Sequence, residues 1–137
     1  MTEYPQLLHT VFDTTRPREL AEFYRQLLGL SYRPGDEPPV DGAPDDSDWL
    51  VLVNSDGVRK LAFQQVPHLS RTTWPEDDVP MQLHVDFTVS NRAELHRQRE
   101  RAEALGAEVV LDLTDDPDEP LYVFADLSGH PFCIFVA

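Results

Sequence analysis

Apolar and polar positions follow the order strand, helix and three strands, and this order occurs twice along the chain. In the first half, strand periodicity marks 7–14, 30–33, 49–53 and 61–66, and helical periodicity marks 17–28. In the second half, strands are predicted at 82–89, 108–113, 121–126 and 132–136, with a charged helix at 92–105. The pattern predicts an α+β chain of two βαβββ modules, 6–67 and 81–137, joined by a connector at 68–80.

The two predicted modules also share residues at equal spacing. Four positions of the first module recur 75 positions later: His9, Phe12, Glu19 and Leu20 are matched by His84, Phe87, Glu94 and Leu95. Each copy then reaches a Leu-Gly pair that closes its helix. A repeat of this length indicates two similar units, each needing the other to cover an apolar face, so a single domain spanning 1–137 is expected.

Strand alternation predicts which side chains share a face. Leu8 and Phe12 alternate with His9 and Asp13 in the first strand, and Leu83 and Phe87 alternate with His84 and Asp86 in the second copy. The apolar set should pack under the helix, which leaves both histidines on the helix-free side. In the last strand of each module, Phe63 and Phe132 should face the helix, so Gln64 and Cys133 should face away. A shift of one residue would exchange Gln64 for Gln65.

Charge and cysteine content narrow the functional classes. The chain has 25 acidic and 11 basic residues, a formal net charge of -14, which repels nucleic acid and anionic membrane surfaces. Its single cysteine, Cys133, cannot form an intrachain disulfide, and no apolar run is long enough to span a bilayer. We therefore expect a cytoplasmic protein that binds neither nucleic acid nor membranes.

Beyond these patterns, the chain resembles the vicinal oxygen chelate superfamily. The resemblance is carried by LLHTVFDTTRPRELAEFYRQLLGL at the start, and by KLAFQQVP, LHVDFTV and DLSGHPFCIF further on. It covers nearly the whole chain, and its members include glyoxalase I, extradiol dioxygenases, fosfomycin-resistance enzymes and bleomycin-resistance proteins. It implies a glyoxalase-like fold in which the two modules form a curled mixed β-sheet cup around a central cavity, and often a homodimer.

The resemblance also implies a metal site. In the metal-dependent members, ligands come from the first, fourth, fifth and eighth strands, which correspond here to His9, Gln64, His84 and Cys133. The two histidines match the ligand type, whereas Cys133 stands where those members keep a glutamate. Two imidazoles suit a divalent transition metal such as Zn, Ni, Co or Fe, and a thiolate ligand would favour zinc. The alternative is that no metal is bound and Cys133 is an apolar core residue.

Two functions follow from these residues. One is a metal-dependent lyase, isomerase or dioxygenase that acts on a small oxygenated substrate. The other is a metal-free binding protein of the bleomycin-resistance type. The net negative charge of the chain would suit this function if the ligand is cationic. Four further residues are predicted to contact the ligand or to support the histidines: Asp13, Asp86, Trp49 and Trp74.

Overall fold

The computed structural model describes residues 3–137, which form two α-helices and eight β-strands. Their order is β1 (Thr10–Thr14), α1 (Pro17–Leu28), β2 (Ser31–Tyr32), β3 (Trp49–Val53), β4 (Arg59–Gln65), β5 (Val85–Val89), α2 (Arg92–Ala104), β6 (Glu108–Asp112), β7 (Leu121–Ala125) and β8 (Pro131–Val136). The α+β class and the twofold βαβββ order predicted from the sequence are confirmed.

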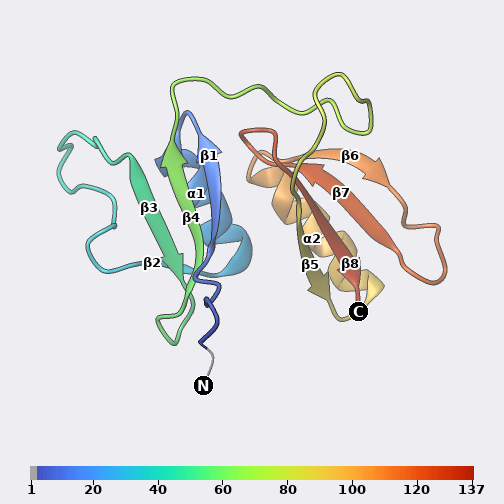
Figure 1. The fold of residues 1–137 in the computed structure, drawn as a ribbon. Coiled ribbons are helices and arrows are strands. Elements are labelled where there is room, and N and C mark those ends of the chain that lie inside the picture. Colours follow the sequence, from blue (N-terminus) through green and yellow to red (C-terminus); the bar gives the residue numbers. More distant parts are fainter. Residues whose placement is uncertain (1–2) are drawn as a thin grey trace. The chain divides into compact units, whose positions relative to one another are not determined.

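The chain divides into two compact units, Met1–Leu69 and Ser70–Ala137, each with one four-stranded sheet and one helix (Figure 1). The strand order is β1-β4-β3-β2 in unit 1 and β5-β8-β7-β6 in unit 2. In each sheet the first and last strands of the module pair in parallel and the other neighbours pair antiparallel. Neither helix of residues 3–137 has the length and apolar character that crossing a membrane requires.

The core of unit 1 lies between α1 and one face of its sheet. Helix α1 begins with Pro17 in its first turn and ends at Gly29, whose left-handed φ of 67° few other residues adopt without strain. Its buried Tyr24 stacks on Phe12 of β1 at 5.2 Å and on Phe63 of β4 at 6.0 Å between ring centroids. Phe63 therefore faces the helix, as the alternation predicted.

Unit 2 repeats this arrangement with a more polar helix. Asn91 caps α2 by accepting a hydrogen bond from the Glu94 amide at 2.9 Å. In the sheet, Phe132 is fully buried and stacks on Phe124 with ring centroids 5.0 Å apart. Leu95 of α2 is also fully buried, so α2 packs through a narrow apolar stripe although most of its surface is charged. Phe132 thus lies in the core, and Cys133, the next residue of β8, lies on the other face of the sheet.

The first strand of each module is shorter than the sequence pattern indicated. Strands β1 and β5 begin at Thr10 and Val85, so each histidine lies one residue before its strand. Leu8 and Leu83, predicted to pack under the helices, are instead 59% and 61% exposed. These two predictions are wrong because β1 pairs with β4 only from Thr10 onward, and β5 pairs with β8 only from Val85 onward. The residues before Thr10 and Val85 therefore have no backbone hydrogen bonds to a neighbouring strand that would keep Leu8 and Leu83 under the helices.

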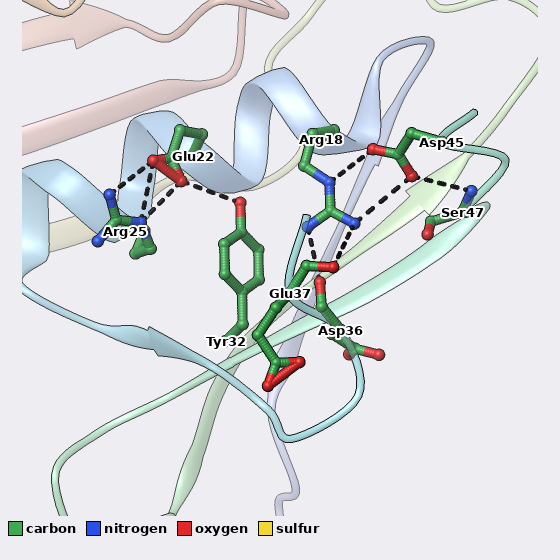
Figure 2. A network of polar contacts seen from close by, with 8 residues as sticks. All are labelled: Arg18, Glu22, Arg25, Tyr32, Asp36, Glu37, Asp45 and Ser47. Atoms are coloured by element: carbon green, nitrogen blue, oxygen red, sulfur yellow. Dashed lines mark hydrogen bonds and ion pairs between the residues drawn. The ribbon is translucent and has the colours of Figure 1, made fainter. Parts of the chain in front are cut away.

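Arg18 of α1 binds the acidic, Pro-rich segment 34–48 of unit 1 at several points (Figure 2). The Nε of Arg18 donates to Asp45 Oδ2 at 2.7 Å, and its Nη1 donates to the Asp36 carbonyl at 2.6 Å. Its guanidinium also lies 4.9 Å from the centre of the Tyr32 ring. The Arg18 guanidinium holds the pKa of Asp45 below its ordinary value. This segment carries many acidic residues and little apolar area, so polar contacts such as these contribute most of its links to the rest of unit 1.

Candidate functional site: two helix-free sheet faces

The turn between β7 and β8 sets the position of Cys133. Asp126 is 1% exposed, and its Oδ1 accepts hydrogen bonds from the amides of Ser128 at 2.9 Å and His130 at 3.0 Å. Gly129, with φ at 90°, completes the turn where a Cβ would lie 2.9 Å from the Arg71 side chain. The closed turn fixes the register of β8, which then pairs in parallel with β5.

This register brings three metal-ligating side chains together on the helix-free face of unit 2. Cys133 lies directly opposite Asp86, and His84 lies two residues before Asp86, so strand alternation keeps all three on one face. Their ligand atoms all lie within 4.8 Å of one another. The His84 Nε2 and the Asp86 Oδ1 are 3.3 Å apart. His84 and Asp86 are exposed and Cys133 is half-buried, so the group is open to solvent.

Cys133 is a thiol rather than a thiolate at neutral pH. Burial raises the pKa of Cys133 to about 11, and the negative charge of Asp86, together with a hydrogen bond to it, adds to the effect. The Asp86 carboxylate therefore lies between two groups that can give it a hydrogen bond, the Cys133 thiol and the His84 imidazole. Without a metal ion, the Cys133 sulfur therefore keeps its proton.

The three side chains fit a divalent transition metal by donor type and spacing. An imidazole nitrogen, a thiolate sulfur and a carboxylate oxygen form a three-ligand set that leaves a coordination position open, as in catalytic zinc sites. Ligand atoms around one tetrahedral ion at 2.0–2.3 Å lie roughly 3.5 Å apart. The three ligand atoms of unit 2 lie within 4.8 Å of one another, close to that spacing. Metal binding would release the Cys133 proton, because thiolate is the ligating form.

Unit 1 does not offer the same donors at the equivalent positions. Its histidine, His9, matches His84, but the residue two places further along is Val11, and the residue opposite Val11 on β4 is Ala62. Unit 1 therefore carries His, Val and Ala where unit 2 carries His, Asp and Cys. The internal repeat could have indicated this difference in advance, since Val11 and Asp86 are 75 positions apart.

Gln64 and Asp13 lie at the other end of the same face. The parallel register pairs Gln64 with Asp13, which confirms that Gln64 rather than Gln65 has the helix-free orientation. Asp13 lies four positions along β1 from His9, about 13 Å at 3.3 Å per residue, and Gln64 lies beside Asp13 on β4. Gln64 is therefore two residues beyond the position equivalent to Cys133, and Asp13 is not beside His9 in the way that Asp86 is beside His84.

Trp49 and His9 cover the helix-free face of unit 1. Their ring centroids are 5.9 Å apart, and Trp49 packs on a buried cluster of Val51, Val53 and Ala62. Burial lowers the pKa of His9, and the charges of Arg59 and Arg33 lower it further, so the imidazole is neutral near pH 7. Trp74 lies in unit 2, in the segment after the unit boundary, where its amide donates to Thr72 Oγ1 at 3.1 Å.

Comparisons with known proteins agree with this architecture. The model of the family described as "Glyoxalase-like domain" matches residues 9–135. A glyoxalase/bleomycin resistance protein/dioxygenase family enzyme from Burkholderia phytofirmans is 13% identical with a TM-score of 0.68, over 94% of this chain and 96% of that one. A protein from Bacillus cereus described as a possible glyoxalase is also 13% identical, with a TM-score of 0.63 over 94% and 96%.

Fosfomycin resistance proteins are also among the similar structures. A variant of FosX from Listeria monocytogenes, in complex with Mn(II) and dihydroxypropylphosphonic acid, is 17% identical with a TM-score of 0.68, over 98% of this chain and 94% of that one. At these identities the likeness concerns the fold. The comparison with curated protein sequences finds no match.

Proposed function

Because the chain belongs to the glyoxalase-like domain family of the vicinal oxygen chelate superfamily, we propose that it binds a small oxygenated molecule at a divalent metal ion held by unit 2. His84, Asp86 and Cys133 are the proposed ligands. The observation that carries the proposal is their grouping within 4.8 Å on one open sheet face. A FosX structure with Mn(II) and a phosphonic acid supports it by analogy of fold.

The Cys133 thiol makes zinc, or an ion similar to it, the metal that best matches the three donors of unit 2. With such an ion, a lyase is the reaction class that suits the site best. Thiolate ligands favour zinc over magnesium or manganese, and zinc has no redox chemistry of its own, so an addition or elimination suits the donors better than an oxygenation. When bound, such an ion supplies Lewis acidity toward substrate oxygens. His84 would provide an imidazole nitrogen and Asp86 a carboxylate oxygen, which leaves the open position of the ion for the substrate.

A glyoxalase-type isomerisation suits these residues less well. That reaction needs a carboxylate free to move a substrate proton. In unit 2 the carboxylate of Asp86 would already be a ligand, and in unit 1 the equivalent positions are Val11 and Ala62. The donors therefore favour binding and polarisation of a substrate over proton shuttling between two carbons.

Metal analysis tests the proposal directly. We expect the chain, purified without chelator and without an affinity tag that binds metal, to contain about one zinc per chain by mass spectrometry. His84→Ala and Cys133→Ala should lose it, and the cobalt-substituted protein should show a thiolate-to-cobalt charge-transfer band that Cys133→Ala lacks. His9→Ala is the matched control, because it removes the equivalent imidazole of unit 1 and should leave the metal in place. An apo protein that takes up no zinc in calorimetry, or equal zinc in Cys133→Ala, would disprove the metal site.

A metal-free binding protein of the bleomycin-resistance type is the second candidate. It is favoured by the apolar positions of unit 1 and by the raised pKa of the Cys133 thiol, which resists ionisation when no metal is present. It predicts that ligand binding survives exhaustive chelation and the His84→Ala change. The homodimer and the cytoplasmic location stay predictions of the sequence.

A further inference from the structure

A β-bulge in unit 1 turns one arginine onto the helix-free face. Leu52 of β3 pairs with Leu61 of β4, but the next residue, Val53, pairs with Arg59, so Lys60 is the extra residue. Val53 is 7% exposed and belongs to the buried cluster on the helix-free face. Because residues directly opposite each other share a face, Arg59 lies on that side as well, whereas regular alternation would put it on the helix side.

A second arginine reaches the same face but is already neutralised. The Arg33 amide donates to the Val51 carbonyl at 2.9 Å, which extends the β2 pairing and aligns Arg33 with Val51. Its guanidinium is held by Asp36, with Nε at 3.1 Å from Oδ2 and Nη2 at 3.3 Å from Oδ1. Among residues 3–137, the Arg59 side chain makes no comparable hydrogen bond or ion pair. In a chain with 25 acidic residues, a half-buried arginine that meets none of them is unusual.

Neutral and apolar groups surround this arginine. Burial and, next to it, the charge of Arg59 lower the pKa of His9, whose ring lies 5.9 Å from the Trp49 ring. His9 Nδ1 is buried without a hydrogen-bond partner among the described residues, a condition that is rare in proteins. Below these rings lies the apolar cluster of Val51, Val53 and Ala62. The positive charge of Arg59 therefore lies at the edge of an aromatic and aliphatic surface.

We propose that Arg59, His9 and Trp49 form a subsite for a small organic acid, which we call the Arg59 subsite. The anionic group binds the Arg59 guanidinium, which presents paired donors that match a carboxylate. The planar apolar body of the acid lies against Trp49, since aromatic faces give large contact area in small-molecule sites. His9 borders both parts without adding charge. The subsite belongs to unit 1 alone and does not depend on a metal in unit 2.

The Arg59 subsite selects an anion although the chain as a whole is acidic. The overall charge of -14 would suit a cationic ligand, because it makes the mean surface potential negative. Recognition, however, depends on the groups that touch the ligand. Here Arg59, which has no ion-pair partner among residues 3–137, lies on the helix-free face of unit 1 and selects an anion. The acidic surface elsewhere repels anions, so acids without an apolar body that contacts Trp49 should bind more weakly.

Probe titrations with the full chain test the Arg59 subsite. Three molecules of similar size differ in charge: benzoate, benzyl alcohol and benzylammonium. In chelator-treated, nitrogen-15-labelled protein, benzoate should give saturable shifts of the Trp49 indole N–H signal. We expect its affinity to exceed those of the other two probes by about tenfold, which corresponds to roughly 1.4 kcal/mol. The chelator separates this result from the metal proposal, which can fail without affecting it.

Variants of neighbouring cations sharpen the test. Arg59→Gln should lower the benzoate affinity about tenfold, to the level of benzyl alcohol, and Arg59→Lys should restore part of it. Lys60→Gln is the matched control, because it removes the same charge one residue away on the exposed bulge and should leave benzoate binding unchanged. The proposal is overturned if Arg59→Gln binds benzoate as the parent chain does, if benzylammonium binds as well as benzoate, or if the Trp49 signal does not move.

Discussion

Replacing Arg18 by methionine removes the charge that fastens the segment 34–48 and keeps most of the aliphatic side chain. The guanidinium donates to Asp45 at 2.7 Å and to the Asp36 carbonyl at 2.6 Å, and lies 4.9 Å from the Tyr32 ring centre (Figure 2). The Arg18 and Asp45 side chains are 20% and 27% exposed, so solvent screens the pair only in part.

The expected loss follows from these contacts. Each of the two short hydrogen bonds contributes about 1 kcal/mol, between the values for exposed ion pairs and for buried charged hydrogen bonds. The contact with Tyr32 adds roughly 0.5 kcal/mol. Asp45 keeps its interaction with the Ser47 amide, which limits the cost of leaving it behind. We therefore expect Arg18→Met to lower the free energy of unfolding of unit 1 by about 2.5 kcal/mol.

Urea denaturation and hydrogen exchange measure this loss. With an m-value of roughly 2 kcal/mol per molar, the unfolding midpoint should fall by about 1.2 M. The amide of Val51, which donates to Asp36 Oδ2 at 2.9 Å, should exchange faster. A double-mutant cycle with Asp45→Asn should give a coupling of about 1 kcal/mol.

The control is Arg97→Met on α2. Arg97 pairs with Glu94 at 3.1 Å, but the two side chains are 64% and 37% exposed, so its loss should cost at most about 0.5 kcal/mol. If Arg18→Met destabilises the protein no more than Arg97→Met does, the interpretation of Arg18 as the anchor of the segment is wrong.

Two further predictions concern titrating groups. Asp86→Asn removes a charge that raises the pKa of Cys133, so iodoacetamide should alkylate Cys133 faster at pH 8 than in the parent chain; an equal or slower rate in metal-free protein would contradict the assignment. Because the pKa of His9 is lowered from 6.5, the unfolded chain binds the proton more readily, and the contribution of His9 to stability is lost as pH falls below about 6.5 toward the folded pKa. His9→Gln should remove this component of the pH dependence, and an NMR titration that gives His9 a pKa above 6.5 would refute it.

Local signals in the sequence determined the elements of this protein. Pro17 and Gly29 bound α1, Asn91 caps α2, and both effects act within a few residues along the chain. The 75-residue repeat adds a second, longer signal, because two copies of one pattern must fold alike. Strand alternation then predicted correctly that Phe63 and Phe132 lie in the cores. These inferences succeeded because each depends on neighbours in sequence.

Register between distant strands was decided by the tertiary structure. Which residue of β4 lies opposite Val11 depends on pairing across some 50 residues, and no local signal specifies it. That pairing puts Ala62 in unit 1 where unit 2 has Cys133, and it separates Gln64 from His9. The bulge at Lys60 likewise reorients Arg59, since one extra residue reverses the face of every side chain before it. The sequence by itself determined that two histidines occupy equivalent places in two modules, whereas only the folded sheets decided which side chains stand beside each of them.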